Sequence, residues 1–407
     1  MKARTSAVKQ AMRLGLGALA LGVGVAAQAA APVIGSLSKN GIRLAVILCA
    51  LCAQLPFAAS AAKIPAILDT DIGDDIDDTW ALTLALKSPE LDLKLVVGDY
   101  GKPLYRGKLI AKLLETARRT DVAVGLGIES GAGQKMRQEK WVEGYDLDRY
   151  PGKVHRDGVQ AMIDFIMQSP EPVTLICIGP VPNIAEALRR EPKIAGRARF
   201  VGMHGSVRVG YSGAAKPSAE WNVRADPKSC QAAFTAPWNM TITPLDTCGL
   251  VQLRGDKYAA VRHCPDVMVK ALIENYRIWD EWSTANGQKS RGVKETSSIL
   301  FDCVAIYLAM SNDLCVMEQV PLRVDDQGYT REAPDGKVVN AALAWRDLPG
   351  FENWLVQRLT GHLPGKAAPP RQSLREPIHD RDLPSSRQAR SPAKEVGNES
   401  SYVRQPL

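Results

Sequence analysis

The 407-residue sequence lacks three features that would each indicate a common class of protein. No Cys-x-x-Cys pair occurs among the six cysteines after residue 63, so a zinc ribbon is not expected. Residues 64–362 carry no excess of basic charge: their net charge is about −3, although the whole chain carries +7. Nucleic-acid binding, which needs clustered cations, is therefore not expected as the main function. Nor is the chain poor in apolar residues: they make up 45% of it, and this content excludes a disordered or collagen-like protein.

The six cysteines of the body could form disulfides in an exported protein, since their number is even. A domain of this size does not need such bonds. Cys177 and Cys303 lie inside apolar runs. We therefore expect these two residues to be small buried hydrophobic side chains.

Acidic residues are absent from the first 63 positions, where seven Lys and Arg flank two apolar runs. The second run, Leu44–Leu51, is followed by the small residues Ala59–Ala62, in the order of a secretory signal. We expect residues 1–62 to be a leader and the protein to be exported, as a periplasmic or secreted protein. The first run, Leu14–Ala31, is either a membrane anchor or sequence translated from a start codon placed too early, and we favour the second.

The other end of the chain, residues 363–407, is rich in Pro, Ser and Arg and has almost no apolar periodicity. This composition predicts a disordered tail. The globular part of the protein is therefore expected at residues 63–362.

Between these ends, short apolar runs alternate with amphipathic stretches. The runs predicted as strands are Ile64–Leu68, Leu93–Val97, Val122–Leu126, Val173–Ile178, Phe200–Met203 and Met240–Pro244. The stretches predicted as helices include Thr79–Lys87, Tyr105–Arg118, Gly158–Gln168, Ile184–Arg190 and Pro227–Ala236. This alternation predicts an α/β fold with a doubly wound, mainly parallel sheet flanked by helices, in a single large domain. Ligands of such folds bind beyond the carboxyl ends of the strands.

Six aspartates lie within ten residues, from Asp69 to Asp78, directly after the first predicted strand. Helix capping explains one or two of them. The others would repel one another and raise each other's pKa unless a cation compensated their charge. Oxygen ligands favour a hard divalent ion, Ca²⁺ or Mg²⁺. The segment therefore predicts a metal site at this end of the strand.

Two known types of acidic loop fit this segment poorly. An EF-hand would need a twelve-residue ligand pattern with a closing Glu, which is missing. A phosphatase with Asp69 as nucleophile and Asp71 as acid would resemble the haloacid-dehalogenase family, but that family's loop usually continues with Gly-Thr or a similar pair. Here Ile72 and Gly73 follow instead.

A third interpretation fits better, because Asp-Thr-Asp-Ile-Gly followed by Asp-Asp-x-x-Ala-Leu resembles the signature of the calcium-dependent, inosine–uridine-preferring nucleoside hydrolases. Five later segments resemble parts of the same family in the same order. They are Tyr105–Val122, His155–Gly158, Thr174–Asn183, Glu220–Asn222 with Asp226 and Pro227, and Phe301 with Asp302. On these matches the chain is identified as a member of that family over roughly residues 64–361.

The resemblance implies hydrolysis of the N-glycosidic bond of nucleosides, with release of base and ribose. Such a reaction needs activated water, anionic surroundings and help for the leaving base. The implied general base toward water is Asp71. The implied ion is Ca²⁺, and its implied ligands are Asp71, Asp78, the backbone carbonyl of Ile178 and Asp302.

The substrate contacts also follow from the resemblance. Asp77 and Asn222 should hold the ribose hydroxyls, and Glu220 the 5′-hydroxyl end. Asp69 is expected to orient other groups rather than to bind the ion. Trp221 either stacks on the base or packs against hydrophobic neighbours, and both roles stay open.

The acidic loop is longer here than in the commonest form of the family, so Asp75 could replace one member of the Asp77 and Asp78 pair. We choose Asp77 and Asp78 because Ala81 and Leu82 then continue the helix in register. Farther along, Trp279 and Trp282 share one face of a predicted helix, which is expected to pack in the core or to cap the substrate pocket.

Two other positions depart from the family pattern. Lys102 stands where a sugar-binding Asn is common, and an ammonium group cannot accept a hydrogen bond. Either Asp99 takes over that role, or the sugar is not plain ribose. Phe301 replaces a His near the leaving base and cannot protonate it, so activation would come from His155 or His204, or the enzyme would prefer bases that leave readily. Of these two, His155 is the predicted substrate-binding residue.

The expected partner is therefore a small nucleoside, in purine or pyrimidine salvage, with no nucleic acid and no membrane contact beyond an N-terminal anchor. A homo-oligomer stays open. Two alternative functions also stay open: a calcium-dependent nucleoside- or sugar-binding protein that has lost turnover through Lys102 and Phe301, and an Asp-based phosphatase.

Overall fold

The computed structural model describes residues 62–130 and 135–362. The expected disordered tail and all but the last residue of the expected leader lie outside the described residues. No helix in the described part is both long enough and apolar enough to cross a membrane.

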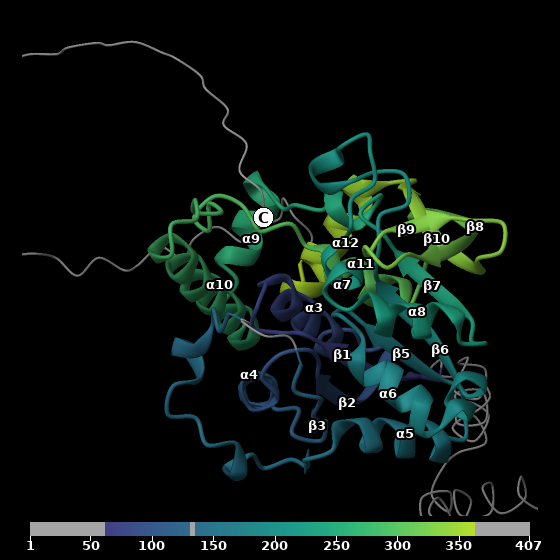
Figure 1. Cartoon of the computed structure of the whole chain (residues 1–407). Coiled ribbons are helices and arrows are strands. Elements are labelled where there is room, and N and C mark those ends of the chain that lie inside the picture. Colours follow the sequence, from purple (N-terminus) through teal and green to yellow (C-terminus); the bar gives the residue numbers. More distant parts are fainter. Residues whose placement is uncertain (1–61, 131–134, 363–407) are drawn as a thin grey trace, which may run out of the picture. The chain divides into compact units, whose positions relative to one another are not determined.

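One ten-stranded sheet organises the described residues, in the order β4-β3-β2-β1-β5-β6-β7-β10-β8-β9 (Figure 1). All neighbours from β4 to β10 pair in parallel, whereas β8 pairs antiparallel with both β10 and β9. The strands are β1 (Ile64–Thr70), β2 (Leu91–Gly98), β3 (Ala123–Leu126), β4 (Val154–His155), β5 (Val173–Cys177), β6 (Ala198–Met203), β7 (Met240–Thr243), β8 (Cys315–Val324), β9 (Thr330–Glu332) and β10 (Lys337–Trp345). The predicted α/β fold with a mainly parallel sheet is confirmed.

Helices cover both faces of this sheet. They are α3 (Asp77–Leu86), α4 (Pro103–Thr116), α5 (Gly158–Gln168), α6 (Pro182–Arg190), α7 (Trp221–Ala225), α8 (Pro227–Thr235), α9 (Gly255–Arg262), α10 (Val267–Ala285), α11 (Phe301–Leu308) and α12 (Leu348–Thr360). Side chains of β1 alternate between two cores: Ala66 and Leu68 pack with α3, α4 and α9 to α12, and Ile67 packs with α5, α6 and α8. The sheet is therefore doubly wound, as predicted.

The elements predicted from the sequence are all present, with ends that differ by no more than two residues. The antiparallel strands β8, β9 and β10 were not predicted. Pro321 lies inside β8, and a proline usually argues against a strand. The six cysteines of the described part are buried and free, which confirms the core role expected for Cys177 and Cys303.

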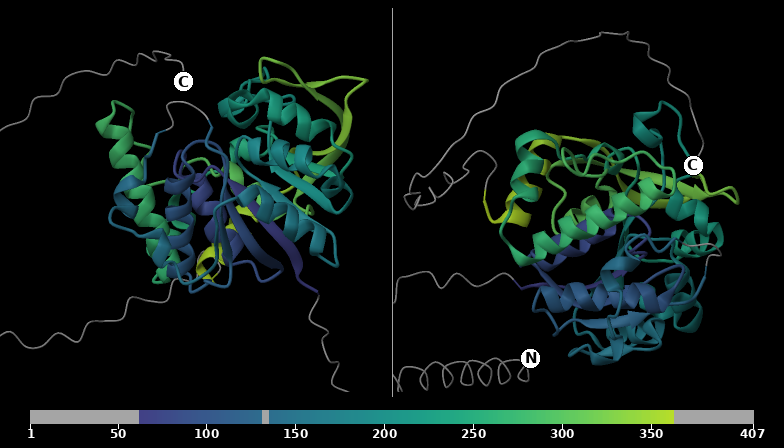
Figure 2. Two further views of the ribbon diagram at one scale, coloured as in Figure 1. Left: turned by 60° about the horizontal axis from the view of Figure 1, so that its bottom comes forward. Right: turned by 90° about the vertical axis from the view of Figure 1, so that its left-hand side faces the viewer.

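The carboxyl ends of β2, β1, β5 and β6 lie side by side in the sheet. The acidic loop follows β1, and Asp99, Ile178 and His204 follow the other three strands directly or within one residue. On one side of this edge, the long helix α10 packs against α3 and α4, as both views in Figure 2 show. The fold thus gathers the predicted site at one edge of the sheet.

Candidate active site

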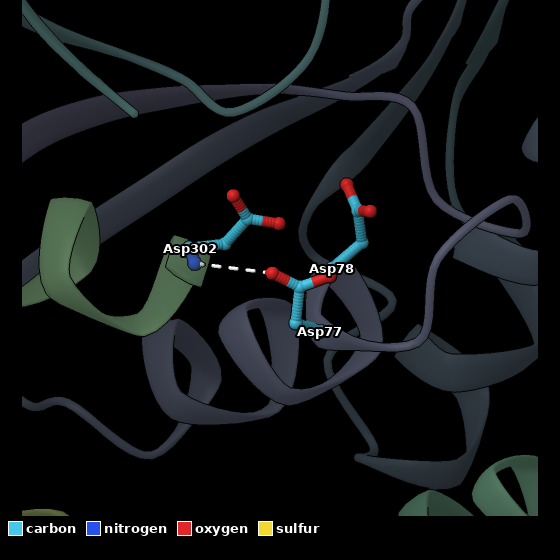
Figure 3. Close-up of side chains that lie close together, drawn as sticks. All are labelled: Asp77, Asp78 and Asp302. Atoms are coloured by element: carbon cyan, nitrogen blue, oxygen red, sulfur yellow. Dashed lines mark hydrogen bonds between the residues drawn. The ribbon is translucent and has the colours of Figure 1, made fainter. Parts of the chain in front are cut away.

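Three buried aspartates form the centre of the site (Figure 3). Asp77 and Asp78 open helix α3, and Asp302 lies in the first turn of α11, more than 220 residues later. Each offers one carboxylate oxygen, and these oxygens all lie within 4.8 Å of one another. The backbone N–H of Asp302 donates to Oδ2 of Asp77 at 3.3 Å, which ties the two helix starts together.

Burial raises the pKa of all three carboxyl groups well above the usual range, and the charges of neighbouring aspartates, Asp71 among them in each case, raise it further. The Thr70 hydroxyl opposes this at one group by donating to Oδ1 of Asp78 at 2.5 Å. Buried anions in contact are stable only with a compensating positive charge. The donor set consists of carboxylate oxygens, which fits a hard divalent ion, so this cluster can hold a metal.

Asp71 is not one of the three aspartates within 4.8 Å, although its charge raises the pKa of both Asp78 and Asp302. Its side chain packs against Gly179, where an added Cβ would lie 3.0 Å from Oδ1 of Asp71. A side chain at position 179 would therefore crowd Asp71. Burial raises the pKa of Asp71 to about 7, and the nearby Arg106 guanidinium opposes the rise. The structure thus brings Asp71 to the acidic cluster and beside Ile178, the residue before Gly179.

The Ile178 carbonyl and Asn222 are also in contact. The Asn222 amide donates to the Ile178 oxygen at 3.2 Å and to the Met203 oxygen at 3.0 Å. The Ile178 N–H donates to the Asp69 oxygen at 2.9 Å, which continues the pairing of β5 with β1. A direct hydrogen bond therefore joins the predicted carbonyl ligand, Ile178, to the predicted sugar-binding residue, Asn222.

Glu220 is buried and caps helix α7. Its carboxylate accepts the backbone N–H groups of Asn222 at 2.8 Å, Val223 at 3.3 Å and Gly205 at 2.9 Å. Burial raises its pKa to about 7 in spite of these three donors. A carboxylate has about four acceptor positions, so roughly one is left for a substrate hydroxyl.

Trp221, the first residue of α7, is 38% exposed, and the Arg224 guanidinium lies 5.4 Å from its ring centroid. Its exposed ring is therefore accessible for stacking on a base. Phe301 makes an edge-to-face contact with Tyr211 at 6.3 Å. The Tyr211 hydroxyl accepts a hydrogen bond from the backbone N–H of Trp221 at 2.8 Å. Tyr211 thus links Trp221 to Phe301, at the start of α11.

The two candidate histidines differ in position and in protonation. His155 ends β4 and is in register, through Gly125 and Val97, with Asp69. Three strand spacings separate it from β1, roughly 14 Å, so the structure does not bring His155 to the acidic cluster. His204 is fully buried, and its Nε2 lies 3.1 Å from the Gly179 oxygen. Burial lowers the pKa of His204 to about 4, so it is neutral near pH 7 and is poorly suited to protonate a leaving base.

Lys102 and Asp99 also take different positions. Lys102 is exposed at the start of helix α4 and lines a cavity of about 940 Å³. Asp99 is fully buried after β2, and neither of its carboxylate oxygens has a hydrogen-bond partner among the described residues. Its pKa is raised well above the usual range by burial and by the charges of Asp69 and Asp71. Of the two, Asp99 is the one placed among the site acids.

Sequence reasoning missed two residues that hold the site together. Arg106 is buried in α4 and donates to the backbone oxygens of Asp71 and, at 2.6 Å, of Ile72. Asn183 donates to Oδ1 of Asp69 at 2.9 Å and accepts the Ile128 N–H at 2.9 Å. A basic residue in a predicted helix and the Asn of a recognised motif were visible in the sequence. Their partners were not, because these contacts join distant segments.

Known proteins resemble this chain over most of the residues that the structure describes. A sequence profile described as inosine-uridine preferring nucleoside hydrolase matches residues 66–350. The non-specific ribonucleoside hydrolase RihC of Klebsiella pneumoniae is 28% identical over 316 residues, which cover 72% of this chain and 98% of that protein. RihC of Salmonella typhimurium is 29% identical over 318 residues, covering 73% and 97%.

Solved structures show the same fold. A plant nucleoside hydrolase, the PpNRh1 enzyme, has a TM-score of 0.61 at 21% identity and covers 74% of this chain and 100% of its own. A purine-preferring ribonucleoside hydrolase from Gardnerella vaginalis has a TM-score of 0.60 at 21% identity, covering 73% and 98%.

Proposed function

The chain belongs to the inosine-uridine preferring nucleoside hydrolase family, whose reaction is hydrolysis of the nucleoside N-glycosidic bond, and we propose that its buried aspartates hold Ca²⁺ for that reaction. The observation that carries the proposal is the contact of Asp77 and Asp78 with Asp302. The predicted ligands are Asp71, Asp78, the carbonyl of Ile178 and Asp302. The position of Asp77 in the same cluster allows it to bind the ion or a ribose hydroxyl.

A bound divalent ion would lower the pKa of water and so make it a better nucleophile. Asp71 is the proposed general base. Burial raises its pKa to about 7 in the metal-free site, and a bound divalent ion would lower it, so Asp71 would be ionised and able to accept a proton near neutral pH. The surrounding carboxylates supply the anionic environment that favours positive charge developing on the ribose ring.

The remaining proposed roles concern the two ends of the substrate. Asn222 and Asp77 would hold ribose hydroxyls, with Glu220 at the 5′ end. Trp221 would stack on the base through its exposed ring. Because Phe301 has no acidic proton, we propose that the enzyme favours bases that leave without protonation by a residue at that position.

We further propose that the protein is exported, from the two apolar runs and their basic flanks in residues 1–62. A role in nucleoside salvage outside the cytoplasm would follow. Substrates to test include inosine, uridine and guanosine, because a RihC relative is named as a non-specific ribonucleoside hydrolase.

The exchange of Asp71 for Asn tests the general base. We expect the purified protein to release reducing sugar from at least one of these nucleosides, and to lose this activity with a chelator and regain it with Ca²⁺. The variant Asp71→Asn should stay folded and lose at least about 100-fold in kcat, within the range that a general base contributes. The assay measures reducing sugar under saturating nucleoside and Ca²⁺.

The conservative surface exchange Asp326→Asn serves as the control, since Asp326 is exposed and pairs with Lys228. Near-normal turnover by Asp71→Asn would sink the general-base assignment. Metal-dependent nucleoside binding without release of sugar would instead favour the binding-protein alternative.

A further inference from the structure

The acidic loop between β1 and α3 is held by donors from outside itself. Each backbone oxygen from Asp71 to Asp75 accepts a hydrogen bond from α4, α10 or residues 137–138. The donors are Arg106 to Asp71 and Ile72, the Tyr105 hydroxyl and the Arg137 N–H to Gly73, the Trp279 indole to Asp74, and the Gln138 amide to Asp75. These bonds join the backbone of the loop to three separate segments that lie outside it.

The contribution of α10 is the least expected, because Trp279 lies 205 residues from its partner in sequence. Its Nε1–H donates to the Asp74 oxygen at 2.9 Å. The ring itself is almost fully buried, with 1% exposed. A buried indole N–H without an acceptor would be costly, so this bond fixes the distance between α10 and the loop.

Arg137 connects the same parts a second time. Its guanidinium lies 5.4 Å from the Trp279 ring centroid and 5.5 Å from that of Trp282. Its Nε lies 3.5 Å from Oδ1 of Asp74, and both side chains are 14% exposed. The backbone N–H of Arg137 donates to the Gly73 oxygen at 3.1 Å. Arg137 therefore pairs with one acid of the loop and also binds the loop backbone.

We propose that Trp279 and Arg137 are positioning residues for the metal site: they hold the acidic loop so that Asp71, before it, and Asp77 and Asp78, after it, converge on one ion. The inference rests on the proposed function, since it needs the metal. It goes further by assigning a role to α10 and to the extra length of the loop. Asp74 is in this view the attachment point of the loop and not a ligand.

The variants Trp279→Phe and Arg137→Met test this proposal. Phe keeps an aromatic ring for Arg137 but removes the N–H donor, and Met keeps the apolar stem of Arg137 but removes its charge. We expect each to weaken Ca²⁺ binding by about tenfold or more, the size seen when groups that orient metal ligands are lost. Isothermal titration of chelator-treated, metal-free protein with Ca²⁺ measures the affinity, and circular dichroism checks the fold.

A merely structural role would lower the melting temperature but leave the Ca²⁺ affinity unchanged. That result for both variants would overturn the proposal. At saturating Ca²⁺ we expect kcat to recover to within about threefold of the wild-type value, because no reacting group has been removed. If Trp279→Phe does not fold, Arg137→Met and Arg137→Lys decide, since neither empties the core.

Trp282→Phe is the matched control. Trp282 lies on the same helix and contacts the same guanidinium, but the structure shows no hydrogen bond from its indole to the acidic loop within the described residues. Its Ca²⁺ affinity should stay within about twofold of wild type. An equal loss in Trp282→Phe and Trp279→Phe would contradict the role of the hydrogen bond. Absence of Ca²⁺ binding by the wild-type protein would refute the proposed function itself, so the two failures are distinguishable.

Discussion

Among the aspartates of the acidic loop, the two predicted for the metal and sugar site are buried, and the alternative Asp75 is exposed. Asp77 and Asp78 are buried beside Asp302, whereas Asp75 is exposed and Asp74 pairs with Arg137. The choice of Asp77 and Asp78 over Asp75 stays a prediction, and this difference in exposure supports it. The sequence could indicate the pair through the helix register. It could not indicate Arg137, because no local pattern ties residue 137 to residue 74.

Asp302→Ala should have opposite effects on the metal-free and the metal-bound protein. Without metal, removing one of three mutually repelling carboxyl groups should leave stability unchanged or raise it. With metal, the loss of a ligand should weaken Ca²⁺ binding by more than about 100-fold, above the range for groups that only orient ligands. The measurement is the melting temperature with chelator and with Ca²⁺.

The surface variant Asp326→Ala provides the reference for Asp302→Ala, since it removes an exposed carboxylate. Its increase in melting temperature on adding Ca²⁺ should equal that of the wild type. An undiminished increase in Asp302→Ala would remove Asp302 from the ligand set. A marked destabilisation of the metal-free variant would show that Asp302 has a structural role instead.

Helices and strands were predicted best where the apolar periodicity of a segment agreed with its place in the strand–helix alternation. The strand–helix alternation up to β7 fixed most elements and placed the acidic loop at a carboxyl edge. The sequence could not show that β10 would join β7 in parallel while β8 returns beside it. Pairing between distant strands depends on tertiary packing, which local propensity does not encode.

Helix α7 allows a test at the level of a single helix, because its capping residue Glu220 and its residue Asn222 are both predicted site residues. In Glu220→Gln, one carboxylate oxygen becomes a donor, so at least one of the three backbone N–H groups at this cap loses its acceptor. We expect the free energy of unfolding in urea to fall by about 1–2 kcal/mol. The KM for nucleoside should also rise. Helix α7 carries Asn222, and the wild-type Glu220 carboxylate has an acceptor position for a substrate hydroxyl.

Asp226→Asn is the comparable change at the next helix. Asp226 caps α8 by accepting from the Ser229 N–H at 3.0 Å and from its hydroxyl at 2.7 Å. Its loss should cost about 1 kcal/mol of stability or less, but the KM should not change, since no predicted substrate contact lies on α8. Equal KM changes in the two variants would argue that Glu220 acts on substrate only through general stability.

For the whole molecule, the family and the fold were both accessible from sequence, since motifs in the right order extended over most of the body. What the sequence could not give is the cost of collecting so many acids in one buried place. Asp69, Asp71 and Glu220 are all buried, and burial raises the pKa of each to about 7. In the absence of a cation, the folded state therefore binds protons more tightly than the unfolded chain does.

This difference determines how stability depends on pH. Between the ordinary pKa values of 3.8 for Asp and 4.5 for Glu and the raised values near 7, the native state holds more protons than the unfolded state. The stabilisation is complete at low pH and is lost as pH rises through about 7. The melting temperature in chelator should thus fall from about pH 5 to about pH 8. Ca²⁺ binds the deprotonated groups, so the increase in melting temperature that it produces should be largest near about pH 8.

Differential scanning calorimetry in matched buffers measures the melting temperature with chelator and with Ca²⁺ across this pH range. In Asp302→Ala, the fall of the melting temperature with pH in chelator should be smaller. A melting temperature of the metal-free protein that rises steadily over this range would contradict the uncompensated acidic centre on which the proposed metal site depends.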